Sequence, residues 1–337
     1  MNIPKDVDPQ VVLVDFSRPL FEPVGFEAER IAQAGGTWSQ FECRSEDQVL
    51  QVARNATVVV VQSVRPLLTR RVIEQLPRAR CLIRAGAGFD SIAVDAATER
   101  GMMVCNTPSY CVDEVADHAI ALMLDCIRHV SRLDRAIHRG EQPVRGPGET
   151  LRLHGSTVGI IGLGAIGRRV AQRLSGWEPR ILAFDPYCTP ERAASVGAEL
   201  VSLEQLLRLA DVITIHCPLT PETEHLINDR TLAMVKPGCI LVNDSRGAVI
   251  DEAALLRALG DGRLWAAGLD VFEREPLPLD SPLRAVENLV LTPHVAAYSP
   301  EARIDLYAEI CEVAGDVVQG RVPRTVVNRQ VLQHLRP

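Results

Sequence analysis

The chain has 337 residues, 47% of them hydrophobic and 23% charged, which is the composition of a globular protein with room for two domains. Its formal net charge of −7 argues against nucleic acid as a main partner. No apolar stretch reaches the length of a membrane span, and the first residues lack a basic segment followed by an apolar one, so we expect a cytoplasmic protein without a membrane partner.

The nine cysteines follow no CxxC spacing, and most of them lie within apolar runs. An odd number in such surroundings favours reduced, buried thiols over a disulfide framework, and it predicts no metal site.

The first hundred residues alternate short apolar runs with amphipathic segments. Strands are predicted at 11–14, 57–61, 81–84 and 102–105, with helices at 26–34, 47–54, 67–76 and 95–99. This alternation indicates a parallel, doubly wound sheet. The strand at 81–84 leads into Ala85-Gly86-Ala87-Gly88, where exposed backbone N–H groups would suit a carboxylate; a plain tight turn is the alternative.

A long helix is predicted at 112–139. Its apolar positions lie all round the helix, so it is expected to be buried in the protein or against a second subunit. The Pro- and Gly-rich residues 142–149 that follow are expected to form an exposed loop.

The most informative stretch of the chain is 157–185. An apolar run at 158–161 is followed by Gly162-x-Gly164-x-x-Gly167, a helix to residue 174, a second apolar run and then Asp185. This is the order of a βαβ dinucleotide-binding unit, although a Gly-rich structural turn is the alternative. The three glycines would permit the turn, the approach of a pyrophosphate and close helix packing, with the N–H groups of Ala165 and Ile166 at the helix N-terminus facing the phosphates. Asp185 would accept hydrogen bonds from ribose hydroxyls and repel a 2′-phosphate, which predicts NAD rather than NADP.

The second half continues the same alternation. Strands are predicted at 212–215, 239–242, 265–272 and 289–292, and helices at 202–209, 231–234, 252–259 and 301–319. Arg246, Glu275 and His294 each follow a strand, so they could meet at the carboxyl edge of the sheet, where ligands bind. Taken singly, they could equally be a surface ion pair, a polar loop residue and a structural histidine.

Several motifs in one order resemble the D-isomer-specific 2-hydroxyacid dehydrogenase family from about residue 80 to 300. They are the Gly162–Gly167 turn, Asp185, Asn243-Asp244-Ser245-Arg246-Gly247, Gly268-Leu269-Asp270-Val271-Phe272 with Glu275-Pro276, and Thr292-Pro293-His294. Segments such as Ile83-Arg84 and Phe184-Asp185-Pro186-Tyr187 look closest to the C-terminal-binding-protein-like branch.

The resemblance implies an α/β fold of two doubly wound parallel-sheet domains. A Rossmann NAD-binding domain, residues 108–305, would be inserted into a flavodoxin-like substrate domain made of residues 1–107 and 306–337. The segment at 112–139 matches one that dimerises relatives, so a homodimer is expected.

The resemblance also implies an NAD-dependent oxidoreductase that interconverts a small 2-keto acid and its D-2-hydroxy acid. His294 would be the general acid and base, Glu275 would hold its imidazole, and Arg246 would bind the substrate carboxylate and carbonyl. The remaining expected contacts are Asp270 with the nicotinamide carboxamide, Cys217, Pro218, Thr223, Asp244, Arg246 and His294 with the cofactor, and Gln62, Ser63, Arg84, Gly86, Ala87 and Tyr298 with the substrate. A structural ion pair is the equal alternative for Arg84.

Positions where the sequence departs from particular members of the superfamily argue against their activities. Formate dehydrogenases of this superfamily carry Gln where Glu275 stands, phosphite dehydrogenases carry Lys where Ala87 stands, and C-terminal binding proteins carry Trp where Ala297 stands. A long phosphoglycerate dehydrogenase with a regulatory domain after residue 337 is not expected. The alternative to an enzyme is an NAD(H)-binding, corepressor-like or scaffold protein with little turnover.

Overall fold

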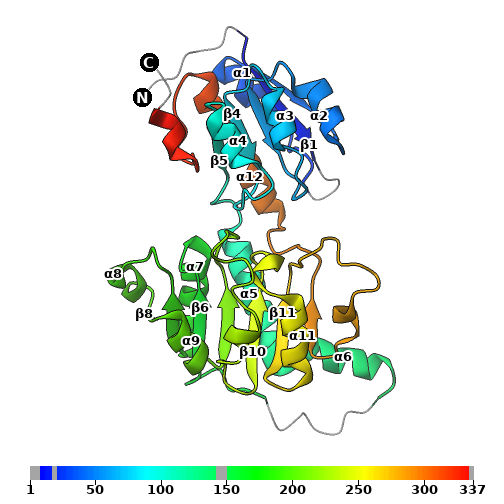
Figure 1. Ribbon diagram of the computed structural model, residues 1–337, viewed down its shortest axis with the longest axis vertical. Coiled ribbons are helices and arrows are strands. Elements are labelled where there is room, and N and C mark those ends of the chain that lie inside the picture. The colour runs from blue at the N-terminus through cyan, green and yellow to red at the C-terminus, as the bar shows by residue number, and fades with distance from the viewer. Residues whose placement is uncertain (1–7, 17–20, 142–149, 334–337) are drawn as a thin grey trace. The chain divides into compact units, whose positions relative to one another are not determined.

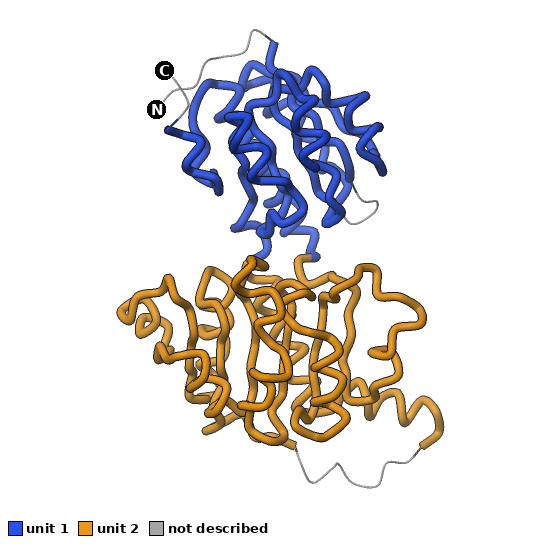
Figure 2. The backbone as a smooth tube through the Cα atoms, in the orientation of Figure 1, with its two compact units in different colours: residues 1–111, 298–337 blue, residues 112–297 orange. Residues whose placement is uncertain are grey.

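The computed structural model describes residues 8–16, 21–141 and 150–333, so the predicted loop at 142–149 lies outside the described residues. The chain divides into two compact units (Figure 2): unit 1 is residues 1–111 with 298–337, and unit 2 is residues 112–297. Both boundaries differ from the expected 107/108 and 305/306. The reason is that helix α5 (Val112–Arg128) opens unit 2, whereas helix α12 (Pro300–Val318) belongs to unit 1 from its first residue.

Unit 1 is built on a parallel sheet of five strands in the order β2-β1-β3-β4-β5 (Figure 1), which is the flavodoxin-like order. The strands are β1 (Gln10–Asp15), β2 (Thr37–Gln40), β3 (Val58–Val61), β4 (Cys81–Arg84) and β5 (Met103–Asn106). One face of the sheet packs on α1 (Glu27–Ala34) and α12, and the other on α2 (Glu46–Ala53), α3 (Arg70–Glu74) and α4 (Val94–Glu99).

Unit 2 is built on a parallel sheet of seven strands in the order β12-β11-β10-β9-β6-β7-β8. The strands are β6 (Thr157–Ile161), β7 (Arg180–Phe184), β8 (Ala198–Leu200), β9 (Val212–Ile215), β10 (Cys239–Asn243), β11 (Leu264–Leu269) and β12 (Leu289–Leu291). The helices are α5, α6 (Val130–His138), α7 (Ala165–Leu174), α8 (Pro190–Ala194), α9 (Leu203–Leu209), α10 (Asp229–Leu232) and α11 (Glu252–Gly260). The strand order reverses between β6 and β9, which is where an open α/β sheet binds its ligand. The predicted α/β fold of two doubly wound domains is confirmed.

The predicted single helix at 112–139 is wrong, because it breaks at His129. This residue has a left-handed φ of 57° and is buried, and the Trp265 indole donates to its Nε2 at 3.2 Å. The Asp125 carboxylate accepts the amide of Ser131 at 2.8 Å, which starts the second helix, α6.

The sequence pattern did not predict three short elements at the sheet edges. Strands β2 and β8 and helix α8 have only three to five residues, and both strands are partly exposed, so they show no apolar run. Strand β11 also ends at Leu269 rather than at Phe272, which frees the next residues to form the site described below.

None of the nine cysteines, all of which lie in the described residues, forms a disulfide, and eight of them are buried. Among the helices of the described chain, none combines the length and hydropathy that crossing a membrane requires.

Candidate active site

The glycine turn after β6 has the geometry of a phosphate cradle. Gly162 adopts φ 91°, and a Cβ there would lie 2.7 Å from the amide nitrogen of Cys217 after β9. A Cβ on Gly167 would overlap the Gly162 carbonyl oxygen, so α7 can pack this closely only with glycine. In contrast, nothing lies within 4 Å of the Cβ position of Gly164, and no side chain caps the start of α7. The N-terminus of α7 therefore faces open space, as a bound pyrophosphate requires.

Asp185 follows β7 and braces this turn. Its carboxylate accepts the Leu163 amide and the Tyr187 amide, each at 2.8 Å. Carboxylate oxygens have lone pairs for further donors, so ribose hydroxyls could bind the same group. Arg168 on α7 lies in its neighbourhood, and its guanidinium donates to the Leu163 carbonyl at 3.2 Å. Arg192 on α8 lies near Arg168 in turn. Burial, and then the charge of Arg192, lower the pKa of Arg168.

The segment after β9 lies on the other side of the point where the strand order reverses. The Cys217 thiol is 9% exposed, and burial raises its pKa to about 11, so it is neutral at physiological pH. Thr223 closes the following loop, because its hydroxyl donates to the Pro218 carbonyl at 2.6 Å and accepts the Thr220 amide at 2.8 Å.

His294 and Glu275 come together in the structure as the sequence predicts. The Nδ1 atom of His294 lies 2.7 Å from Oε2 of Glu275, and the other carboxylate oxygen accepts the Phe272 amide at 3.1 Å. His294 has a left-handed φ of 56°, and its amide donates to the Asp270 carbonyl at 2.7 Å. The imidazole and the carboxylate are 32% and 20% exposed, so the pair is open to a ligand on one side.

Asp270 holds the loop that carries His294. Its side chain has no exposed surface, and it accepts the amides of Val295 and Ala296 at 3.0 and 2.9 Å and the Thr292 hydroxyl at 2.6 Å. Burial alone would raise the pKa of Asp270, but these hydrogen bonds and one from His118 outweigh it and bring the pKa below its ordinary value. The expected contact of Asp270 with the nicotinamide carboxamide stays a prediction.

The backbone next to Arg246 packs closely on the segment that binds Glu275, because Gly247 follows Arg246. A Cβ on Gly247 would overlap the backbone of Phe272, the residue whose amide binds Glu275. The buried amide of Asn243 shapes the turn, donating to the Arg246 carbonyl at 2.9 Å while its oxygen accepts the Ser245 amide at 3.0 Å. The Arg246 side chain is half-buried, and its guanidinium donates to the Ser245 carbonyl at 2.7 Å.

Asp244 forms a buried pair with a residue that the sequence analysis did not single out. Its carboxylate lies 3.1 Å from Nδ1 of His216, and the two side chains are 0% and 1% exposed. The Thr214 hydroxyl meets the other imidazole nitrogen at 2.9 Å. The two residues directly follow β9 and β10, so this approach lies at the carboxyl ends of these neighbouring strands. Its predicted contact with the cofactor stays a prediction.

Unit 1 carries the predicted substrate residues on its own sheet edge. Arg84 is 7% exposed, and its guanidinium donates to the Ala85 carbonyl, while Gly86 has φ 155° and donates its amide to the Arg84 carbonyl at 2.9 Å. The Ala87 carbonyl accepts the Asn106 amide at 2.7 Å, which fixes the loop. Beside them the Asp15 carboxylate accepts the amides of Gln62 and Ser63 at 2.7 and 2.8 Å. Burial raises the pKa of Asp15, and the charge of Arg84 opposes the shift.

Two further predicted contacts are aromatic or amide groups of unit 1. The Gln62 side-chain amide donates to the Tyr307 hydroxyl at 2.6 Å and to the Phe21 carbonyl at 3.2 Å, so both of its hydrogens are already bonded within unit 1. Tyr298 packs edge-on against Phe21, with ring centroids 4.8 Å apart.

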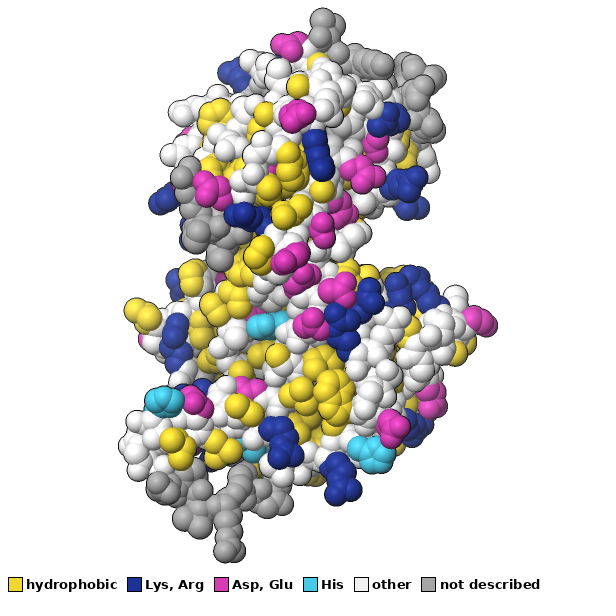
Figure 3. All heavy atoms as spheres, turned by 180° about the vertical axis from the view of Figure 1, so that it is seen from behind, with side chains coloured by type: hydrophobic (Ala, Val, Ile, Leu, Met, Phe, Trp, Pro, Cys, Tyr) yellow, Lys and Arg dark blue, Asp and Glu magenta, His cyan; other side chains and the backbone are white. Residues whose placement is uncertain are grey.

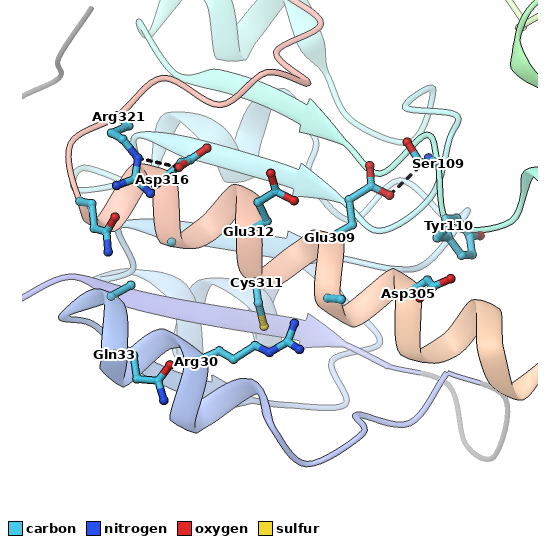
Figure 4. Close-up of a pocket in the computed structure, with 14 residues that line it drawn as sticks. Arg30, Gln33, Ser109, Tyr110, Asp305, Glu309, Cys311, Glu312, Asp316 and Arg321 are labelled. Carbon is cyan, nitrogen blue, oxygen red and sulfur yellow. Dashed lines mark hydrogen bonds and ion pairs between the residues drawn. The ribbon is translucent and has the colours of Figure 1, made fainter.

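A cavity of about 700 Å³ lies elsewhere in unit 1 (Figure 4). It opens between α1 and α12, with Arg30 on one side and Glu309 and Glu312 on the other, and the Ser109 amide donates to Glu309. None of the predicted site residues lines it. Over the described residues, His, Cys, Asp and Glu side chains form no group of three or more that could hold a metal ion.

Comparison with known proteins identifies the family. The model described as "D-isomer specific 2-hydroxyacid dehydrogenase, NAD binding domain" matches residues 120–296. The chain is 37% identical to the glyoxylate reductase of Pyrococcus furiosus over 314 residues, covering 88% of this chain and 92% of that one. The chain therefore belongs to the D-isomer-specific 2-hydroxyacid dehydrogenase family and carries its NAD-binding domain. The C-terminal-binding-protein-like branch stays a prediction.

Other relatives agree with this family. The chain is 38% identical to the D-3-phosphoglycerate dehydrogenase of Methanocaldococcus jannaschii, covering 91% of this chain but only 58% of that protein. The chain thus spans about three-fifths of that relative's length. The crystal structure of a glyoxylate reductase from Paecilomyes thermophila is similar with a TM-score of 0.86 and 28% identity, covering 96% of this chain and all of that one.

Proposed function

We propose that this protein is an NAD(H)-dependent oxidoreductase that interconverts a small 2-keto acid and its D-2-hydroxy acid. The observation that carries the proposal is the His294–Glu275 pair at 2.7 Å, within a domain whose glycine turn is shaped for a dinucleotide. The chemistry needs a proton donor beside a hydride carrier; in this unit His294 would be the donor, and the glycine turn would hold the carrier, NADH.

The cofactor would be held by Gly162, Gly164 and the N-terminus of α7, with Asp185 on its ribose. The open Cβ position of Gly164 and the uncapped helix support this assignment. Bound NADH supplies the hydride. Asp185 favours NAD over NADP because its carboxylate would repel a 2′-phosphate.

His294 would protonate the carbonyl oxygen during reduction and would accept the hydroxyl proton during oxidation. Glu275 accepts a hydrogen bond from Nδ1–H, which leaves Nε2 as the atom that exchanges a proton with the substrate. The carboxylate also stabilises the imidazolium when the proton is held.

Arg246 would bind the substrate carboxylate and polarise the carbonyl, since its planar guanidinium can donate two parallel hydrogen bonds. The turn shaped by Asn243 and Gly247 supports this assignment, because it packs the backbone beside Arg246 against Phe272, whose amide binds Glu275. In unit 1, the buried Arg84 and the Gly86-Ala87 loop are suited to an anionic group and are proposed as substrate-binding residues.

We also propose that the protein is a cytoplasmic homodimer. Hydrophobic side chains gather on the face of unit 2 that is turned to the viewer in Figure 3. On α6, Val130 and Ile137 are 61% and 58% exposed, which is unusual for residues of this type on one short helix. Nine thiols, eight of them buried, fit a reducing compartment.

The test is the loss of NADH absorbance with a panel of 2-keto acids. The panel starts from glyoxylate and extends to 2-keto acids with longer and charged side chains. D-3-phosphoglycerate, a 2-hydroxy acid, is tested in the oxidative direction with NAD⁺, where NADH absorbance rises. These two compounds are in the names of two relatives. Turnover of at least one acid supports the proposal, and any chiral product should have the D configuration. Tight NADH binding without turnover of any acid contradicts it and favours the NAD-binding scaffold.

A further inference from the structure

His118 lies on α5, the helix that packs against β10, β11 and β12, and it reaches the residues that support the active-site loop. Its Nε2 atom is 2.9 Å from the Thr292 hydroxyl oxygen and 3.5 Å from Oδ1 of Asp270. The imidazole is 21% exposed, so these contacts are largely shielded from water.

The direction of the hydrogen bond follows from the donors present. A hydroxyl has one proton, and the Thr292 hydroxyl donates it to Asp270 at 2.6 Å. Its oxygen can therefore only accept from the imidazole, so Nε2 of His118 carries a hydrogen. That hydrogen points between the Thr292 oxygen and the Asp270 carboxylate.

The same carboxylate holds the loop that carries His294. It accepts the Val295 and Ala296 amides, and the Asp270 carbonyl accepts the His294 amide at 2.7 Å. These bonds keep His294 in a left-handed conformation that residues other than glycine rarely adopt. A displaced carboxylate would release two of the amides that fix this backbone.

We infer that His118 is a positioning residue for His294: through Thr292 and Asp270 it holds residues 292–296 in the conformation that presents the imidazole. The consequence for turnover rests on the function proposed above, whereas the effect on the loop does not. His118 touches neither of the two residues of the proposed acid–base pair, so it acts through others.

The charges around His118 agree with a firmly held N–H group. The hydrogen bond to Asp270 raises the pKa of His118, burial opposes the shift, and the charges of Asp270 and Asp244 add to it. Asp244 is itself paired with His216, which leaves Asp270 as the acid that bonds His118 directly. Two other acids of α5, Asp113 and Asp117, form ion pairs with Arg173 of α7.

Two substitutions separate the loss of the donor from the loss of the side chain. His118→Leu removes the N–H, whereas His118→Gln places an amide N–H near the position of Nε2. His138→Leu, on the exposed face of α6, is the matched control. If His118→Leu does not fold, Thr292→Val breaks the same relay with an isosteric side chain.

The first readout is amide exchange of Val295 and Ala296 in the full chain with NADH bound, which needs no substrate. We expect exchange about tenfold faster in His118→Leu and close to wild type in His118→Gln and His138→Leu, as loss of one charge-assisted hydrogen bond implies. Equal exchange in all four proteins overturns the inference, whatever the protein catalyses.

The second readout is steady-state kinetics with a turned-over acid. We expect His118→Leu to lower kcat about tenfold or more with the KM for NADH unchanged, and His118→Gln to restore most of it. Faster exchange with unchanged kcat overturns the positioning role. If wild type turns over no acid, the proposed function fails, and the exchange data with the His294 imidazole NMR signals still decide the inference.

Discussion

His294 and Glu275 meet at 2.7 Å although 19 residues separate them in sequence. Both are anchored on the end of β11: Glu275 by the Phe272 amide, and His294 by the Asp270 carbonyl. The segment that directly follows β11 therefore holds the acid–base pair, and Gly247, which follows Arg246 after the neighbouring strand, packs against the backbone of the same segment at Phe272. The geometry of the site depends on backbone contacts that tolerate little change.

Gly247→Ala should destabilise the protein and inactivate it, because the added methyl group overlaps the Phe272 backbone. We expect a loss of about 1–3 kcal/mol in the free energy of unfolding, measured by urea denaturation. We also expect kcat to fall, because the displaced Phe272 backbone holds Glu275. The matched control is Gly260→Ala at the end of α11, where nothing lies within 4 Å and where a change within about 1 kcal/mol is expected. Equal effects at both glycines would show that the close contact is not a constraint.

Asp185→Ala should weaken NADH binding and narrow the preference over NADPH. Removing the carboxylate removes its repulsion of a 2′-phosphate and leaves Arg168 and Arg192 nearby to attract that group. Fluorescence titration of both reduced cofactors measures the ratio of their dissociation constants, which should move towards NADPH by about tenfold or more. Part of the loss for NADH would come from the glycine turn, since Leu163 loses its acceptor. An unchanged ratio would remove Asp185 from cofactor selection.

The stability contributed by His118 should depend on pH in one direction. Its folded pKa is raised above the unfolded value of about 6.5, mainly by the hydrogen bond to Asp270. The contribution is then fully present below the unfolded pKa and is lost as pH rises through the folded pKa. In urea unfolding from about pH 6 upwards, the stability difference between wild type and His118→Gln should shrink with rising pH. A difference that grows with pH would contradict the sign of the shift.

Much of this architecture was readable from sequence because buried parallel strands are apolar runs and the Gly162–Gly167 turn has a fixed spacing. The strand ends with Arg246, Glu275 and His294 followed from the same alternation. The short polar edge strands β2 and β8 gave no such signal, and the helix break at His129 depends on Trp265 from a distant strand. Nor could sequence reveal that His118 contacts Thr292, since 174 residues separate them. Asn243 was part of a motif, but its hold on the Arg246 backbone is a tertiary contact.

The central claim is that His294 transfers the proton, and His294→Ala tests it most directly. With the best acid of the panel, we expect kcat to fall by about 10²–10⁴-fold, the contribution of a general acid, while the dissociation constant of NADH stays within about twofold. His225→Ala is the matched control, since His225 also has a left-handed φ and pairs with a glutamate, Glu273, at 2.9 Å; its kcat should stay near wild type. If His294→Ala keeps its kcat, or loses turnover together with NADH binding, His294 is not the proton donor assigned to it.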